Sequence, residues 1–204
     1  MWYTYKNVTD ANGNKIGTER VTTDNYSTAS QYGREFHGDA LPKLYGGFNT
    51  SVRFYGVDLS ATFTYQIGGK VIDSGYQMYM TVPSGTSTGF TYHRDQWKAW
   101  SAENTTSNIP SFTYADSNVN GTSDRFLIDA SYLSIQNITL GYTLPKRITR
   151  KFLVDSLRIY LTCDNVWFFS KRQGLDTRQS FTGGSNPYYY APIRTFSGGV
   201  TITF

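Results

Sequence analysis

Apolar and polar side chains alternate without a break over residues 57–67. Side chains of a β-strand point to opposite faces in turn, so this segment is predicted to be a strand with one apolar and one polar face. Its length suits a strand that crosses a bilayer in a β-barrel, which needs about 9 to 11 residues. We expect the polar face to carry Asp58, Ser60, Thr62, Thr64 and Gln66.

The neighbouring segments extend this pattern. Residues 48–55 alternate in the same way and meet the first strand at a tight corner, which predicts an antiparallel hairpin. Residues 130–144 form a further predicted strand, whose alternation slips by one residue at Gln136–Asn137. One extra residue exchanges the two faces of a strand, so the slip predicts a β-bulge. Pro145 then ends the strand, because proline cannot donate a ladder hydrogen bond.

Two more strands are predicted near the C-terminal end of the sequence. Residues 157–169 place Arg158, Tyr160 and Asp164 on a polar face, and residues 195–204 alternate again and end on Phe204. Strands of a transmembrane barrel combine an apolar side that faces lipid with a polar side that faces the lumen. The expected fold class is therefore all-β, as an antiparallel portion of a transmembrane β-barrel.

The connections between these strands have two sizes. Residues 55–56 and 146–156 are short connections, whereas residues 68–129 and 170–192 are long and rich in glycine, serine, threonine, asparagine and aromatic residues. Outer-membrane barrels have short turns in the periplasm and long loops outside the cell. We therefore expect the long connections to be extracellular and the last strand to end at the periplasmic face.

This organisation predicts four regions along the chain. They are an extracellular loop region (1–43), a hairpin (44–69), a long extracellular loop (70–129) and the last three strands (130–204). Five strands are too few to close a barrel, since the smallest have about 8, and no apolar signal segment opens the sequence. The sequence is therefore interpreted as the C-terminal part of a longer chain.

Composition narrows the classes of function. Mean hydropathy is -0.43, and no apolar run reaches the length of a transmembrane helix. The net charge of +4 comes from scattered basic residues, so nucleic-acid binding is not expected. The single Cys163 permits no internal disulfide, and neither His37 nor His93 has partners at ligand spacing. We expect no catalytic residue, no metal and no cofactor.

The segment DANGN at residues 10–14 has two interpretations. Its composition is typical of a calcium loop, but the glutamate that completes an EF-hand is missing. Asn12–Gly13 is equally typical of a type I′ turn, and the turn is the favoured interpretation.

Aromatic residues in the long connections are candidate contacts for a substrate or a partner protein. Trp97 and Trp100 have the spacing of one helical turn, and Tyr188, Tyr189 and Tyr190 form a run before the last strand. The alternative for both groups is that they hold down long loops. A place in the interfacial aromatic girdle is a further alternative for the tyrosines.

Four strings and the terminal residue follow one another in a distinctive order: GDALPKLYGGFNTS (38–51), SDRFLIDASYL (123–133), NITLGYTLP (137–145), GLD (174–176) and Phe204. Together they resemble the C-terminal third of the barrel in SusC/RagA-family TonB-linked outer-membrane proteins. Their order and spacing are more specific than any one of them.

The resemblance implies an outer-membrane importer of glycans or peptides. It implies as partners the remainder of the barrel and its plug, a SusD-like surface lipoprotein, the TonB complex, and the barrel-assembly machinery acting at the strand that ends on Phe204. The alternative from strand alternation alone is a secreted β-sandwich, such as a carbohydrate-binding module with exposed aromatic residues.

Overall fold

The computed structural model describes residues 2–81, 91–113, 116–172, 174–179 and 182–204. They form two compact units. The sheet unit comprises Asp39–Ile72 and Ile128–Phe204, and the loop unit comprises Met1–Gly38 and Asp73–Leu127. None of the helices in the described parts of the chain is both long and apolar enough to span a membrane.

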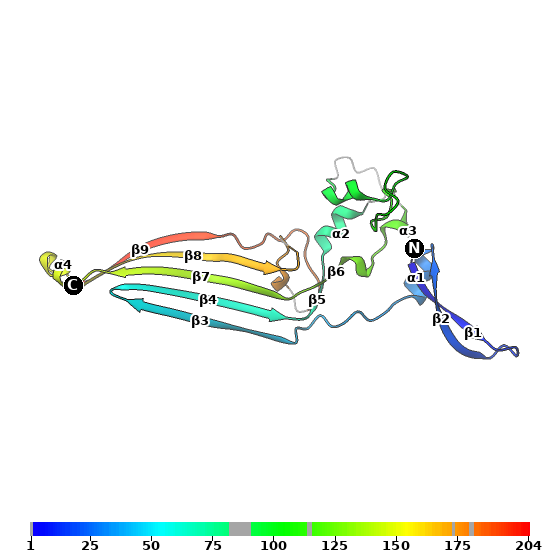
Figure 1. Ribbon diagram of the computed structural model, residues 1–204, viewed down its shortest axis with the longest axis horizontal. Coiled ribbons are helices and arrows are strands. Elements are labelled where there is room, and N and C mark those ends of the chain that lie inside the picture. The colour runs from blue at the N-terminus through cyan, green and yellow to red at the C-terminus, as the bar shows by residue number, and fades with distance from the viewer. Residues whose placement is uncertain (1, 82–90, 114–115, 173, 180–181) are drawn as a thin grey trace. The chain divides into compact units, whose positions relative to one another are not determined.

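The sheet unit is built on a five-stranded antiparallel sheet (Figure 1). Each strand pairs with the next main strand of the chain, so the sheet is a simple meander. All five strands were predicted from alternation, although their ends differ by a few residues. Their order is β3 (Leu44–Phe54), β4 (Val57–Ile67), β7 (Tyr132–Thr143), β8 (Ser156–Ser170) and β9 (Thr195–Thr203).

The corner between β3 and β4 is a two-residue hairpin loop. Tyr55 and Gly56 both have positive φ, at 46° and 87°, which is the backbone of a type I′ turn. A Cβ atom on Gly56 would lie 2.6 Å from the carbonyl oxygen of Thr143, so this position also needs glycine for space. The predicted hairpin is confirmed.

The predicted β-bulge lies in β7. The pairing of β7 with β4 shifts register between Thr62 and Phe63, and the pairing with β8 shifts between Ile135 and Asn137. Gln136 is the unpaired residue, and its side-chain amide donates to Thr64 Oγ1 at 3.0 Å. The bulge keeps apolar residues on one face along the whole of β7.

Register sorts the side chains of the sheet into an apolar and a polar face. One row across the strands is Val52, Leu59, Leu140, Leu161 and Gly198. The adjacent polar row is Ser51, Ser60, Thr139, Thr162 and Ser197. Large side chains on the apolar face remain about half exposed, for example Leu140 at 48% and Leu161 at 65%. A soluble core would bury such a face, so the exposure is typical of a surface that contacts lipid.

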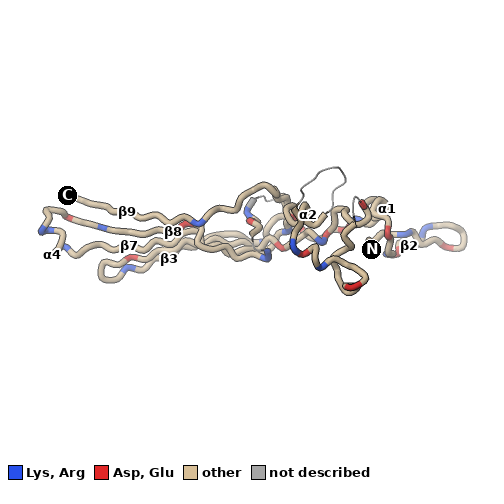
Figure 2. Tube along the Cα trace, turned by 90° about the horizontal axis from the view of Figure 1, so that it is seen from above, with Lys and Arg blue, Asp and Glu red and all other residues tan. Residues whose placement is uncertain are grey.

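The two ends of the sheet carry connections of different sizes (Figure 1). At one end lie the β3–β4 corner, the C-terminus and a short turn with α4 (Lys146–Thr149) and η3 (Arg150–Phe152). The other end carries the long connections, which include η4 (Thr177–Gln179) and a small sheet of β5 (Lys70–Ile72) with β6 (Leu127–Asp129). Figure 2 shows that charged residues are sparse along the five strands and gather towards their ends.

The loop unit has secondary structure that strand alternation did not predict. Its described residues form a hairpin, three short α-helices and two 3₁₀ turns: β1 (Trp2–Thr9), β2 (Lys15–Thr23), α1 (Tyr26–Tyr32), α2 (Ser74–Met80), η1 (Arg94–Lys98), α3 (Ser117–Asn120) and η2 (Asp124–Phe126). Side-chain caps fix the helix starts. Asn25 accepts a hydrogen bond from the Thr28 backbone at 3.1 Å, and Asp73 accepts one from the Tyr76 backbone at 2.9 Å.

The DANGN segment forms the turn of the β1–β2 hairpin, but the type I′ assignment is wrong. Gly13 has a φ of 84°, whereas Asn12 is not among the residues with positive φ, and a type I′ turn needs both. The Asp10 carboxylate accepts hydrogen bonds from the backbones of Asn12 and Asn14, each at 2.8 Å. The bond from Asn14 is the main reason why the pKa of Asp10 is lowered. Asp10 therefore closes a three-residue loop that ends on a left-handed glycine.

The core of the loop unit surrounds Phe126, whose side chain is fully buried. Its ring meets the ring of Tyr76 edge to face at 6.2 Å, and its carbonyl oxygen accepts from the Asp73 backbone at 2.9 Å. Met80 and Ala29 are the other buried apolar residues in the described part of this unit.

Replacing Phe126 with alanine should destabilise the loop unit by about 3–5 kcal/mol, because the substitution leaves a cavity in a closed core. Hydrogen exchange of the α2 amides in the complete protein measures this local unfolding. Phe112→Ala is the control, since Phe112 is 52% exposed. Equal loss of protection in both variants would contradict the assignment of Phe126 as the core residue.

Candidate functional site on the polar face of the sheet

Polar side chains on β7 and β8 form a short hydrogen-bonded ladder between these two strands. Thr139 and Thr162 share a hydrogen bond between their hydroxyl oxygens at 2.8 Å. One row further along, the Asn137 amide donates to the Asp164 carboxylate at 2.7 Å. Thr139 also donates to the Asn137 side-chain oxygen at 3.1 Å, which links the two rows. These bonds restrict the rotamers of the four side chains that take part in them.

An ion pair bridges β4 and β8 above the strand that separates them. The Arg158 guanidinium donates Nε to Asp58 Oδ1 at 3.1 Å and Nη2 to Asp58 Oδ2 at 2.5 Å. The pair passes over Gly141 of β7, where a Cβ atom would lie 2.5 Å from Arg158 Nη2 and 2.6 Å from Asp58 Oδ2. The bidentate contact therefore depends on the absence of a side chain at position 141.

The long-loop end of the same face is tightly packed. Gln66 is 5% exposed, and its amide donates to the carbonyl oxygen of Ala130 at 3.4 Å. Ser134 is 2% exposed and accepts from the Gln136 amide at 3.1 Å. At this end of the polar face, the buried polar groups of Gln66 and Ser134 are thus hydrogen-bonded within the protein.

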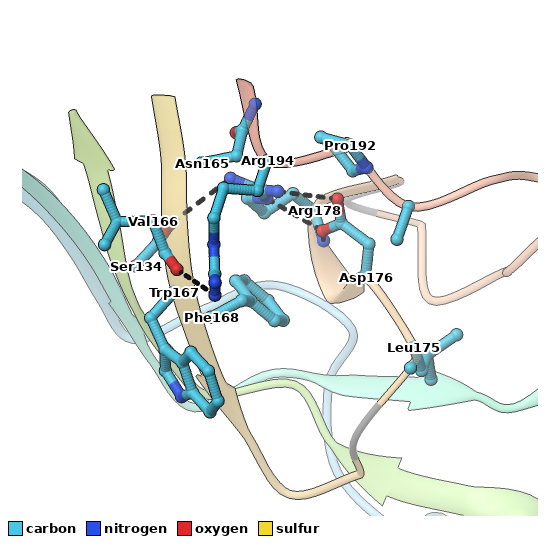
Figure 3. Close-up of a pocket in the computed structure, with 12 residues that line it drawn as sticks. Ser134, Asn165, Val166, Trp167, Phe168, Leu175, Asp176, Arg178, Pro192 and Arg194 are labelled. Carbon is cyan, nitrogen blue, oxygen red and sulfur yellow. Dashed lines mark hydrogen bonds and ion pairs between the residues drawn. The ribbon is translucent and has the colours of Figure 1, made fainter. Parts of the chain in front are cut away.

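A pocket of about 350 Å³ opens beside β8 at this end of the sheet (Figure 3). Its lining includes Trp167 and Phe168 of β8, Asp176 and Arg178 of the loop that follows β8, and Arg194 just before β9. The Arg178 guanidinium donates to both carboxylate oxygens of Asp176 at 2.8 Å and lies 4.8 Å from the centre of the Phe168 ring. The hydrogen bond to Asp176 is the main reason why the pKa of Arg178 is raised.

Comparison with known proteins shows which proteins the chain resembles. No protein-family model matches the chain. The TonB-dependent receptor P3 of Formosa agariphila is 25% identical over 181 residues, which cover 84% of this chain and 17% of that receptor. The TonB-dependent receptor SusC of Bacteroides thetaiotaomicron is 24% identical over 100% of this chain and 19% of its own length. The chain resembles part of a SusC-type TonB-dependent receptor.

Solved structures support the same fold. The RagAB peptide importer in its closed-closed state superposes with a TM-score of 0.70 and 21% identity, covering 99% of this chain and 23% of that one. A second structure, of the RagAB peptide transporter, gives a TM-score of 0.71 at 21% identity, with 22% of that chain covered. The SusC/RagA-type resemblance of the sequence motifs is therefore confirmed. The chain spans less than a fifth of the length of the curated relatives that it matches.

The polar residues singled out from the SusC/RagA-type sequence lie as alternation requires. One set lies on β4 and the other on β8, all in phase with the polar rows: Asp58, Ser60, Thr62, Thr64, Gln66, Arg158, Tyr160 and Asp164. The structure brings Asp58 and Arg158 into contact, and the Arg158 guanidinium also lies 5.2 Å from the centre of the Tyr160 ring. Their role as lumen-facing residues is a proposal taken up below.

The aromatic candidates are all exposed, but they belong to different units. In the loop unit, Trp97 lies in η1 and is 92% exposed, whereas Trp100 lies beyond the end of that turn. In the sheet unit, the three tyrosines at 188–190 are 75%, 55% and 93% exposed. Phe204 follows the last residue of β9 and is also exposed.

Sequence reasoning missed three contributors to the site of this SusC/RagA-type sheet. Gly141 makes room for the ion pair, and Arg178 and Arg194 supply charge to the pocket. A glycine inside a predicted strand is the signal that could have found the first, because it often marks a close approach of other atoms. The two arginines lie in irregular segments, where alternation gives no information.

Proposed function

We propose that this chain forms part of the wall of a TonB-dependent importer in a bacterial outer membrane, with the apolar face of the sheet against lipid and the polar face towards the lumen. The observation that carries the proposal is the separation of the two faces. The apolar rows are continuous across all five strands and exposed, whereas the polar rows form a bonded ladder with an ion pair.

The proposed position is the C-terminal part of the barrel, with the long connections outside the cell. Lumen-facing residues on β4 and β8, including Asp58, Arg158 and Asp164, then contribute to the wall of the import path. Trp97, Trp100 and the tyrosines at 188–190 are proposed contacts for the substrate or for a SusD-like surface lipoprotein. The remaining barrel and plug, the TonB complex, and the barrel-assembly machinery at Phe204 complete the proposed partners.

The proposed cargo is a glycan or a peptide. The matched solved structure is described as a peptide importer, and the matched curated relatives are described as receptors. We assign the chain no catalytic step. The secreted β-sandwich is not favoured, because the relatives are TonB-dependent receptors and the apolar face of the sheet lies open in the described residues.

Cysteine labelling in whole cells tests this arrangement. The background is the complete protein with Cys163→Ser, and the matched variants are Tyr190→Cys and Tyr55→Cys. These tyrosines are 93% and 86% exposed, and the strand pairing places them in connections at opposite ends of the sheet. A membrane-impermeant maleimide should label position 190 in intact cells and position 55 only after the outer membrane is permeabilised. Labelling of both positions in intact cells, or recovery of the protein in the soluble fraction, would refute the proposal.

A further inference from the structure

The pocket beside β8 forms where two paired strands separate. Pairing of β8 with β9 ends at Asp164 and Thr195, and Asn165 then takes a left-handed backbone with a φ of 49°. Beyond this point two side chains bridge the gap. The Asn165 amide donates to the carbonyl oxygen of Ile193 at 3.2 Å, and Arg194 Nη2 donates to the carbonyl oxygen of Val166 at 2.6 Å. These two hydrogen bonds link the segments on either side of the gap, and Figure 3 shows the one from Arg194 to Val166.

The charges in this pocket do not balance. Arg178 is matched by Asp176 through two hydrogen bonds at 2.8 Å. Arg194 has no carboxylate within ion-pairing distance among the described residues, and of its five N–H donors only the one bonded to Val166 has an acceptor there. Two guanidinium groups against one carboxylate leave a single excess positive charge.

Apart from Ser134 and Asn165, the rest of the lining is apolar, and the pocket has the size that small ligands need. The Arg194 guanidinium lies 5.5 Å from the centre of the Trp167 ring. This cation–π contact restricts the orientation of the planar guanidinium and of its N–H donors. Phe168, Leu175 and Pro192 supply apolar surface around it. A volume of about 350 Å³ lies within the range of small-molecule sites, which are mainly apolar with a few placed polar groups.

We propose that this pocket binds the carboxylate group of a ligand, with Arg194 as its main donor and the apolar lining against the neighbouring part of the ligand. A monoanion matches the single excess charge, whereas a phosphate group carries about -1.5 to -2 at neutral pH. The proposal rests on the proposed importer function, since it makes the ligand a substrate with a free carboxylate. The C-terminus of a peptide and a uronic acid of a glycan both supply that chemistry.

Calorimetric binding to the complete detergent-purified protein tests the proposal with two matched pairs of probes. One pair is N-acetyl-trialanine with a free C-terminus and its C-terminal amide, and the other is trigalacturonate and its methyl ester. Arg194→Gln should weaken binding of the acid form about 10- to 100-fold and leave binding of the neutral form unchanged, since the loss of a charge-assisted hydrogen bond lowers affinity by about that factor. Arg194→Lys should fall between the two, because it keeps the charge and loses the planar fork.

Arg147→Gln is the control, since Arg147 is an exposed arginine in the short turn at the other end of the sheet. An acid preference lost in Arg194→Gln but kept in Arg147→Gln supports the proposal, and the pair of probes that shows it identifies the source of the carboxylate. Equal binding of acid and neutral forms by the unmodified protein overturns it. The importer function would still hold after that result if labelling places position 190 outside the cell. Failure of the carboxylate pocket can therefore be told apart from failure of the importer function.

Discussion

Ala61→Arg should block assembly of the protein into the outer membrane, whereas Thr62→Arg should be tolerated. The two residues are neighbours at the middle of β4, and register places them on opposite faces of the sheet. Ala61 pairs with Thr50 and Ile138 in an apolar row, and Thr62 pairs with Asn49 and Asn137 in a polar row. An arginine at the midplane of a lipid face costs about 2–4 kcal/mol, while a lumen position keeps the charge in water.

Assembly is measured as the folded fraction on unheated gels of isolated outer membranes. Ala61→Leu is the control for size, because it adds a side chain to the apolar row without a charge, and it should assemble normally. If Ala61→Arg and Thr62→Arg assemble equally well, the face assigned to lipid is wrong.

Gly141→Ala should lower the stability of the sheet, although alanine normally suits a strand better than glycine does. The added methyl group would lie 2.5–2.7 Å from Arg158 Nη2 and the Asp58 carboxylate oxygens, so the bidentate ion pair could not keep its geometry. Forcing a methyl group into a filled site costs about 1–3 kcal/mol. Urea unfolding of the complete protein in lipid vesicles measures the change.

A background that lacks the ion pair isolates this cause. In the Asp58→Ala, Arg158→Ala variant, the same Gly141→Ala change should have little effect, since the three atoms nearest to the added methyl group are then absent. Gly17→Ala controls for the general effect of the substitution in a strand, because a Cβ atom there meets nothing within 4 Å. An equal loss in the presence and absence of the ion pair would show that Gly141 matters for another reason.

Alternation was sufficient to predict the main sheet because its two faces meet different environments. Val57–Ile67 changes face at every residue, and the slip at Gln136–Asn137 located the bulge in β7 to within one residue. The β1–β2 hairpin was missed, because neither of its faces is consistently apolar. Helices α1 and α2 are seven residues each and depend on the caps Asn25 and Asp73, so their periodicity is too short to detect.

The sequence predicted on which face of the sheet each polar residue of the site lies, but not which of these residues contact one another. Parity along β4 and β8 places Asp58 and Arg158 on the same side, yet they are separated by 100 positions in sequence. Their meeting depends on the register of three strands and on the bulge that shifts it. The pocket depends further on the left-handed Asn165 and on Arg194 in an irregular segment, for which the sequence contains no periodic signal.

The space over β7 also limits how this sheet can change over generations. While Asp58 and Arg158 are paired, any side chain at position 141 is disfavoured, so the glycine is selected indirectly. Once the pair is lost, position 141 is free to accept a larger residue, and that residue then obstructs the return of the pair. The three positions should therefore be inherited as a block, and lineages that abandon it should rarely regain it.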